Sequence, residues 1–128
     1  MVSIPTDPIE GTWLPIKAVL AGDPAPGLAL EQMRLVIHAG TYAVHFSDQV
    51  TDAGSIALSQ DGESRMLTLS SRSGVNAGRT IPSIYQLVGD RLRICYGLNG
   101  RIPGTFESTP GSEHYLVTYR RQSDIDIP

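Results

Sequence analysis

The chain has 128 residues, of which 41% are hydrophobic and 18% are charged, and its formal net charge is −3. This length fits one domain with a single core. The composition excludes both a disordered tail and a coiled coil. Because the acidic balance provides no basic surface for a phosphate backbone, nucleic-acid binding is not expected.

Signals for export or membrane insertion are missing from the sequence. Residues 1–8 have neither a basic start nor an apolar segment of the kind found in secretory leaders. No apolar run approaches the roughly 18 residues that a membrane-spanning helix needs. We therefore expect a cytoplasmic protein that does not enter a membrane.

The first predicted strand covers Ile9–Leu20 and includes Gly11-Thr12-Trp13, which holds the only tryptophan. Residues 1–8 carry two prolines and no periodicity, so we expect an N-terminal tail. Pro15 interrupts the strand and belongs at a bulge or an unpaired edge position, because proline cannot donate to a ladder. After a break, Gly27–Met33 predicts one short helix.

Alternating apolar and polar residues then predict a rapid succession of strands. Asp61-Gly62 and Gly89-Asp90 are strong signals for tight turns between them. Residues 97–112 form the longest irregular stretch, and 122–128 form a polar C-terminal tail. The predicted strands after the helix are Arg34–His38, Thr41–Phe46, Val50–Ser59, Arg65–Arg72, Arg79–Val88, Arg91–Tyr96 and His114–Arg121.

This pattern predicts an all-β domain over residues 9–121, with about eight strands and turn signals at roughly 8–12-residue spacing. No long helix alternates with the strands, which argues against a parallel α/β sheet. A single antiparallel up-and-down β-barrel is favoured because closure removes exposed strand edges. An open sandwich is the alternative that spacing alone leaves open.

Several segments in order resemble a bacterial family of lipocalin-like domains that is well represented in planctomycetes. The resemblance covers the chain from about Ile9 to Arg121 and implies an eight-stranded up-and-down barrel, but no general function. Two departures are Pro15, where similar sequences run straight, and Ile102, which separates an Arg-Pro pair. The residues that carry the resemblance are Gly11-Thr12-Trp13, Leu35-Val36-Ile37, Tyr42, Ile84-Tyr85-Gln86-Leu87, Gly89 to Cys95, Arg101-Ile102-Pro103, Phe106, Ser108, Pro110-Gly111-Ser112 and Tyr119-Arg120-Arg121.

The resemblance also implies how one end of the barrel is closed. In lipocalin-like barrels a tryptophan in the position of Trp13 lies at the closed end, with an arginine of the last strand over its ring. Arg120 or Arg121 is expected to take that place. An arginine over an indole contributes about 0.5–2 kcal/mol, depending on its desolvation. These residues are therefore expected to be structural.

Candidate ligand-binding residues are concentrated on the faces expected to form the barrel interior and in the irregular stretch. Tyrosines combine a large apolar body with one hydroxyl, which suits a cavity lining and suits a filled core equally well. Arginines that point inward would bind a carboxylate or phosphate, and Arg93 is the most interesting because it neighbours apolar positions. The candidates are Tyr42, Tyr85, Arg93, Tyr96, Phe106 and Tyr115.

Catalytic and metal sites find little support. His38 and His45 flank the predicted turn at Ala39-Gly40, and a suitable register would place them opposite each other, as in part of a zinc site. A solvated or core pair is favoured, since no metal-binding spacing accompanies them. Cys95 is the only cysteine, so it makes no intrachain disulfide, and a buried structural thiol is favoured over a nucleophile. No cofactor and no metal are expected.

Two functional hypotheses follow from this reading. The first is a non-catalytic barrel that binds a small, partly apolar ligand at its open end, with residues 97–112 and 21–32 forming the mouth. The second is a protein-interaction module, such as an inhibitor or immunity-type protein that docks on a partner. A third and weaker alternative is an enzyme centred on His45, His114 or Cys95.

Overall fold

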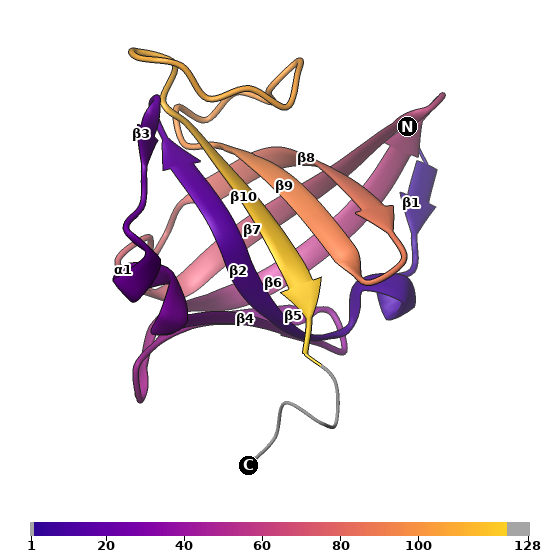
Figure 1. Ribbon diagram of the computed structural model, residues 1–128. Helices are drawn as coiled ribbons and strands as arrows, with labels where there is room; N and C mark the ends of the chain where they lie inside the picture. The colour runs from indigo at the N-terminus through magenta and orange to yellow at the C-terminus, as the bar shows by residue number, and fades with distance from the viewer. Residues whose placement is uncertain (1, 123–128) are drawn as a thin grey trace.

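The computed structural model describes residues 2–122 and shows one closed antiparallel β-barrel of eight strands (Figure 1). The predicted all-β, up-and-down barrel is confirmed, and the open sandwich is excluded. Each strand pairs with the next along the chain, and the last pairs with the first. The barrel strands are β2 (Gly11–Leu20), β4 (Met33–His38), β5 (Thr41–Phe46), β6 (Gln49–Asp61), β7 (Ser64–Gly74), β8 (Thr80–Val88), β9 (Arg91–Gly97) and β10 (His114–Arg121).

Closure between β2 and β10 extends along most of both strands, from Tyr115 opposite Leu20 to Arg121 opposite Trp13. The ladder shifts register between Thr118 and Tyr119, which pair with Lys17 and Pro15. Ile16 is thus an extra residue on β2, so the strand bulges directly after Pro15. This agrees with the expectation that the proline lies at a bulge or at an unpaired edge position.

The N-terminal segment differs from the expected tail. Residues Val2–Ile4 form β1, which pairs with β6 from Leu58 to Gln60. This pairing exists because β6 runs on to Asp61, whereas its ladder with β5 ends at Ser55. A strand of three residues is too short to show a period, so the sequence pattern could not reveal it. A 3-10 helix, Asp7–Ile9, then leads into β2.

The connection between β2 and β4 contains the two remaining short elements. β3 (Asp23–Pro24) pairs with the end of β2, and α1 is a helix of five residues, Gly27–Glu31. The helix is shorter than predicted because Met33 already belongs to β4. Neither α1 nor the 3-10 helix is long and apolar enough to cross a membrane.

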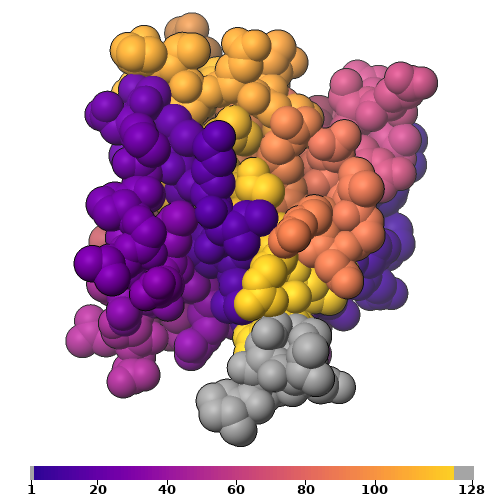
Figure 2. Space-filling view, in the orientation of Figure 1, coloured from indigo at the N-terminus to yellow at the C-terminus, as the bar shows by residue number. Residues whose placement is uncertain are grey.

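Alternating connections give the barrel two distinct ends. The tight turns at 39–40, 62–63 and 89–90 lie at one end, where β2 begins and β10 finishes. The longer connections 21–32, 75–79 and 98–113 leave and re-enter the barrel at the other end, as does the turn at 47–48, and residues 102–106 reach back along the wall to the β6–β7 hairpin. Figure 2 shows the 98–113 connection along the top edge of the molecule in this view. The expected mouth segments are therefore at the same end, and the tight turns are at the Trp13 end.

Candidate functional site

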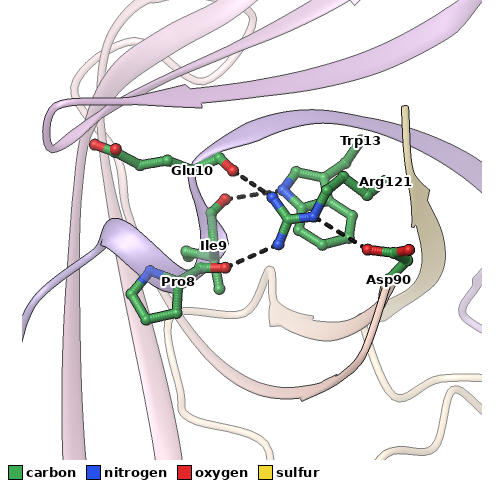
Figure 3. Close-up of polar contacts among 6 residues, drawn as sticks. All are labelled: Pro8, Ile9, Glu10, Trp13, Asp90 and Arg121. Carbon is green, nitrogen blue, oxygen red and sulfur yellow. Dashed lines mark hydrogen bonds and ion pairs between the residues drawn. The ribbon is translucent and has the colours of Figure 1, made fainter. Parts of the chain in front are cut away.

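Trp13 is completely buried at the tight-turn end of the barrel (Figure 3). Its Nε1 donates a hydrogen bond of 2.9 Å to the carbonyl oxygen of Ile9, which is also buried. The Arg121 guanidinium lies over the indole, 4.3 Å from the ring centroid. Of the two arginines expected to cover the tryptophan, Arg121 takes this position. Arg120 points elsewhere and lines a hollow beside α1.

Arg121 also fastens the N-terminal segment to the end of the barrel (Figure 3). Its Nη2 donates to the Pro8 carbonyl oxygen at 2.9 Å, and its Nη1 donates to that of Glu10. Its Nε lies 3.5 Å from the exposed carboxylate of Asp90. One guanidinium thus joins the last strand, the turn at 89–90 and the entry to β2. The contacts of Arg121 are thus with the protein's own backbone, the Trp13 ring and Asp90.

The interior of the barrel contains a tyrosine cluster. The hydroxyls of Tyr96 and Tyr119 are hydrogen-bonded at 2.8 Å, and burial raises the pKa of both. Tyr115 stacks on Tyr96 with ring centroids 5.7 Å apart, and burial raises its pKa as well. Of these two residues, both suggested by the sequence as ligand contacts, Tyr96 belongs to the buried core and Tyr115 is partly buried against it.

A buried carboxylate lies beside this cluster. Asp52 Oδ1 accepts hydrogen bonds from the Tyr42 hydroxyl at 3.1 Å and the Ser71 hydroxyl at 2.5 Å, and its Oδ2 accepts one from Asn76 Nδ2 at 3.1 Å. Burial, together with the charge of Asp52 and despite the Ser71 hydrogen bond, raises the pKa of Tyr42 to about 12. Sequence reasoning missed Asp52. The sequence signal that could have identified it is its spacing. Asp52 lies four residues before Ile56, so the two side chains point to the same face of β6, which is otherwise apolar.

A hollow lies in the barrel wall, apart from the Tyr96–Tyr119 pair of the interior. It encloses about 580 Å³ between the β6–β7 hairpin, the second half of β8 and residues 102–106. We call it the wall hollow. Of the six candidate ligand residues, Tyr85 and Phe106 line it, whereas Tyr42, Arg93, Tyr96 and Tyr115 do not. Its lining residues are Asp61, Glu63, Ser64, Arg65, Met66, Ile84, Tyr85, Gln86, Leu87, Ile102, Pro103, Gly104 and Phe106.

The wall hollow exists because β7 and β8 part. Their ladder runs from Ser70 opposite Thr80 to Met66 opposite Ile84 and stops there, although both strands continue. Burial raises the pKa of Tyr85 at this point, while the nearby Arg65 guanidinium acts in the opposite direction. Sequence reasoning could name Tyr85 but not the hairpin residues opposite it, since the divergence of two strands is a tertiary feature.

Residues 102–106 form a roof over the wall hollow, and one side chain of β9 supports it. The Arg93 guanidinium lies 4.0 Å from the centroid of the Phe106 ring, and its Nη2 donates to Gln86 Oε1 at 2.9 Å. Arg93 Nε is buried without a hydrogen-bond partner among the described residues. Arg93 therefore points outward beneath the roof, and it does not reach into the barrel.

The chain just beyond the roof is held to the barrel by hydrogen bonds. The Ser108 hydroxyl donates to the His114 carbonyl oxygen at 2.7 Å and accepts from the Gly22 amide at 3.1 Å. The Glu107 carbonyl oxygen lies 3.1 Å from His114 Nδ1 and 3.8 Å from the Cys95 sulfur. Cys95 is consequently buried although it faces outward, and burial raises the pKa of its thiol. This environment does not favour a nucleophilic thiolate.

A smaller hollow of about 420 Å³ lies between α1 and the strands β2 and β4, and we call it the helix hollow. The β2–β4 ladder covers only Gly11 to Trp13, so the strands part after it and α1 fills part of the gap. The helix hollow is less polar than the wall hollow and has Gly27 and Leu30 among its lining residues.

The histidines do not come together. In the β4–β5 ladder His45 lies opposite Arg34, and His38 lies opposite Thr41, so the two histidines are at different ends of the hairpin. Burial and the Arg34 charge both lower the pKa of His45. Within residues 2–122, no three His, Cys, Asp or Glu side chains are grouped closely enough to hold a metal ion.

Comparisons of the chain with protein-family models, with curated proteins and with solved structures gave no match.

Proposed function

We propose that this protein binds a small, partly apolar ligand in the wall hollow. The observation that carries the proposal is the hollow itself. Its volume of about 580 Å³ lies in the range of small-molecule sites, which is roughly 300–1,000 Å³. The sequence hypothesis placed the ligand inside the open end, whereas the wall is favoured here because Tyr96 and Tyr119 are hydrogen-bonded to each other in the barrel interior. The proposed site is therefore in the wall.

The lining of the wall hollow suits a ligand with an apolar body and a polar group. Met66, Ile84 and Phe106 provide apolar surface, while Asp61 and Arg65 provide charge at the hairpin. Such a mixture, in which few polar groups orient a mainly apolar molecule, is characteristic of binding sites. Binding without catalysis is proposed, because the one thiol near the roof is a poor nucleophile in its buried setting.

We also propose kinship with the lipocalin-like bacterial domains that the sequence resembles. The closed eight-stranded meander and the Arg121 guanidinium over Trp13 support this relation. The proposed binding function does not depend on it, since one fold hosts many functions.

Two glycines provide a matched test of the binding site. Gly104 lines the wall hollow and Gly27 lines the helix hollow. At both positions an added Cβ meets no heavy atom within 4 Å and the backbone is not left-handed, so either glycine accepts a side chain without strain. Gly104→Trp is expected to fill the wall hollow, and Gly27→Trp to fill the helix hollow.

The probe is the neutral fluorescent dye N-phenylnaphthylamine, titrated into each variant. We expect the wild-type protein and Gly27→Trp to bind it with the same affinity, and Gly104→Trp to bind it at least about tenfold more weakly, since a tenfold change needs only about 1.4 kcal/mol. Thermal unfolding verifies that both variants are folded. Dye binding that Gly104→Trp leaves unchanged, or an absence of binding to the wild type, would refute the proposed site.

A further inference from the structure

The strand β8 has a free edge at the wall hollow. Its ladder with β9 continues to Val88 opposite Arg91, whereas its ladder with β7 ends at Ile84. Residues 86–88 are therefore paired on one side only. A row of unpaired backbone groups at a strand edge is a template for pairing with another chain.

Hairpin geometry identifies the residue whose backbone faces the wall hollow. The turn of two residues at 89–90 is closed by Val88 and Arg91, which is the pair that exchanges hydrogen bonds in such hairpins. Because bonding direction alternates along an antiparallel strand, Gln86 also bonds to β9. Leu87 therefore directs its N–H and C=O away from β9. The β7 residue that would lie opposite it in register is in the 62–63 turn, so no ladder partner exists.

The surroundings of this edge suit an extended chain. Side chains of a strand added beside Leu87 would alternate between the two faces of the sheet. On the outer face they would meet Ile84 and the roof residues Ile102 and Phe106, which supply an apolar pocket. Peptide recognition by strand addition has this form, with main-chain hydrogen bonds for affinity and pockets for alternate side chains.

The negative charge of the β6–β7 hairpin determines which extended peptides would bind at this edge. Asp61 and Glu63 both line the hollow and are exposed, and neither makes an ion pair with any residue between 2 and 122. The one basic residue of the lining, Arg65, is engaged with Tyr85. Two unpaired carboxylates beside the free edge favour lysine or arginine in the incoming chain.

We propose that the ligand of the wall hollow is an extended, positively charged peptide segment that adds a strand to the free edge of β8. This inference rests on the binding function proposed above and names its ligand class. An apolar side chain of the peptide lies against Ile84 and Ile102 in the hollow, its backbone pairs with Leu87, and its basic side chains lie near Asp61 and Glu63.

The test uses a dye-labelled, acetylated and amidated heptapeptide of alternating lysine and valine, with fluorescence anisotropy as the readout. The comparison peptide is identical but carries N-methyl groups on its valine amides, which removes one row of backbone donors. We expect the N-methyl peptide to bind about tenfold more weakly, the effect of one or two net hydrogen bonds. Equal binding of the two peptides would overturn strand addition.

Protein variants test the same contact from the other side. Leu87→Pro removes the donor that faces the hollow while keeping the β8–β9 hydrogen bonds, and Leu87→Ala controls for the lost side chain. We expect the proline variant to bind the peptide about fivefold more weakly than the alanine variant, as the loss of one hydrogen bond predicts. The double variant Asp61→Asn, Glu63→Gln is expected to weaken binding and its salt dependence; unchanged binding would refute the charge assignment.

The glycine variants separate the two proposals. Gly104→Trp should abolish peptide binding and Gly27→Trp should not. If N-phenylnaphthylamine binds in the wall hollow but the peptide does not, the peptide inference is wrong and the proposed function stands. If neither probe binds the wild type, both are wrong. Peptide binding that is insensitive to Gly104→Trp places the peptide elsewhere and contradicts the inference.

Discussion

Arg121 makes three kinds of contact with a single side chain. It stacks on Trp13, donates to the backbone carbonyl oxygens of Pro8 and Glu10, and forms an ion pair with Asp90. Only a planar, forked cation can make the first two together, so lysine is not equivalent at this position. The ion pair matters less, because Asp90 is 84% exposed and solvent screens it.

Because the stacking and hydrogen bonds of Arg121 should contribute more to stability than its ion pair, two substitutions are expected to have different costs. Arg121→Lys should lower the free energy of unfolding by about 1–2 kcal/mol, through lost stacking and lost hydrogen bonds. Asp90→Asn should lower it by less than about 0.5 kcal/mol. Urea unfolding followed by tryptophan fluorescence measures both. A larger cost for Asp90→Asn than for Arg121→Lys would show that the ion pair dominates.

Removal of Trp13 itself should be far more damaging. Trp13→Ala leaves a large cavity among buried residues, so we expect a loss of about 3–5 kcal/mol in the free energy of unfolding. Any protein that still folds should bind N-phenylnaphthylamine normally, because Trp13 does not line the wall hollow. A variant of unchanged stability that has lost dye binding would contradict the structural role of Trp13.

Asp52 is the residue whose role the interior makes most specific. Asp52→Ala leaves the donors of Tyr42, Ser71 and Asn76 without their acceptor, so we expect a loss of about 2–3 kcal/mol in stability. Asp48→Ala, in the exposed 47–48 turn, is the control and should change little. The charge of Asp52 also raises the pKa of Tyr42, so the variant should ionise Tyr42 at lower pH in a spectrophotometric titration. An unchanged Tyr42 titration would argue against this contact.

At the scale of elements, the sequence was most informative where the backbone itself dictates the structure. The ranges Thr41–Phe46 and His114–Arg121 were predicted with the bounds that the structure shows, and the turn at Gly89-Asp90 lies where predicted. Alternation and turn chemistry are local, so a single sequence records them. Only the existence of the barrel follows from these signals, and not its contents.

The candidate site was less predictable. Phe106 and Tyr85 could be named from their residue type, but the wall hollow depends on where the β7–β8 ladder ends and on where the roof lies. Residues 98–113 have no period, and contacts such as that between Arg93 and Phe106 join chain segments that no local pattern connects. β1 was not predicted because its pairing with β6 likewise joins segments that are far apart in the sequence.

The rate at which a reagent modifies the Cys95 thiol is expected to report whether the roof segment is held in place. The thiol is buried beneath Glu107, next to the Arg93–Phe106 contact. Phe106→Ala removes that contact, which contributes about 0.5–1 kcal/mol, and should raise the rate of Cys95 modification by a disulfide reagent a few-fold. Val75→Ala, in the exposed 75–79 connection, is the control and should leave the rate unchanged. A rate that neither variant alters would show that the roof does not control access to the thiol.

All five tyrosines of the chain occupy buried or half-buried positions. Together they make the stability of the whole molecule depend on pH. Burial is the leading cause of a raised pKa at Tyr42, Tyr85, Tyr96, Tyr115 and Tyr119 alike. In the unfolded chain each tyrosine titrates near its ordinary value of about 10. Folding and tyrosine ionisation are therefore linked.

The direction of the pH dependence follows from proton counts. Below about pH 10 both the folded and the unfolded chain keep their tyrosine protons, and the stability contributed by this linkage is fully present. Above that pH the unfolded chain loses protons first, so the free energy of unfolding should fall steadily as pH rises, through the Tyr42 value of about 12. Urea unfolding at about pH 8 and about pH 11 should show lower stability at the higher pH. Tyrosinate absorbance should rise at higher pH in the folded protein than in the urea-unfolded protein, and coincident titration curves would contradict the burial of the tyrosines inside the barrel.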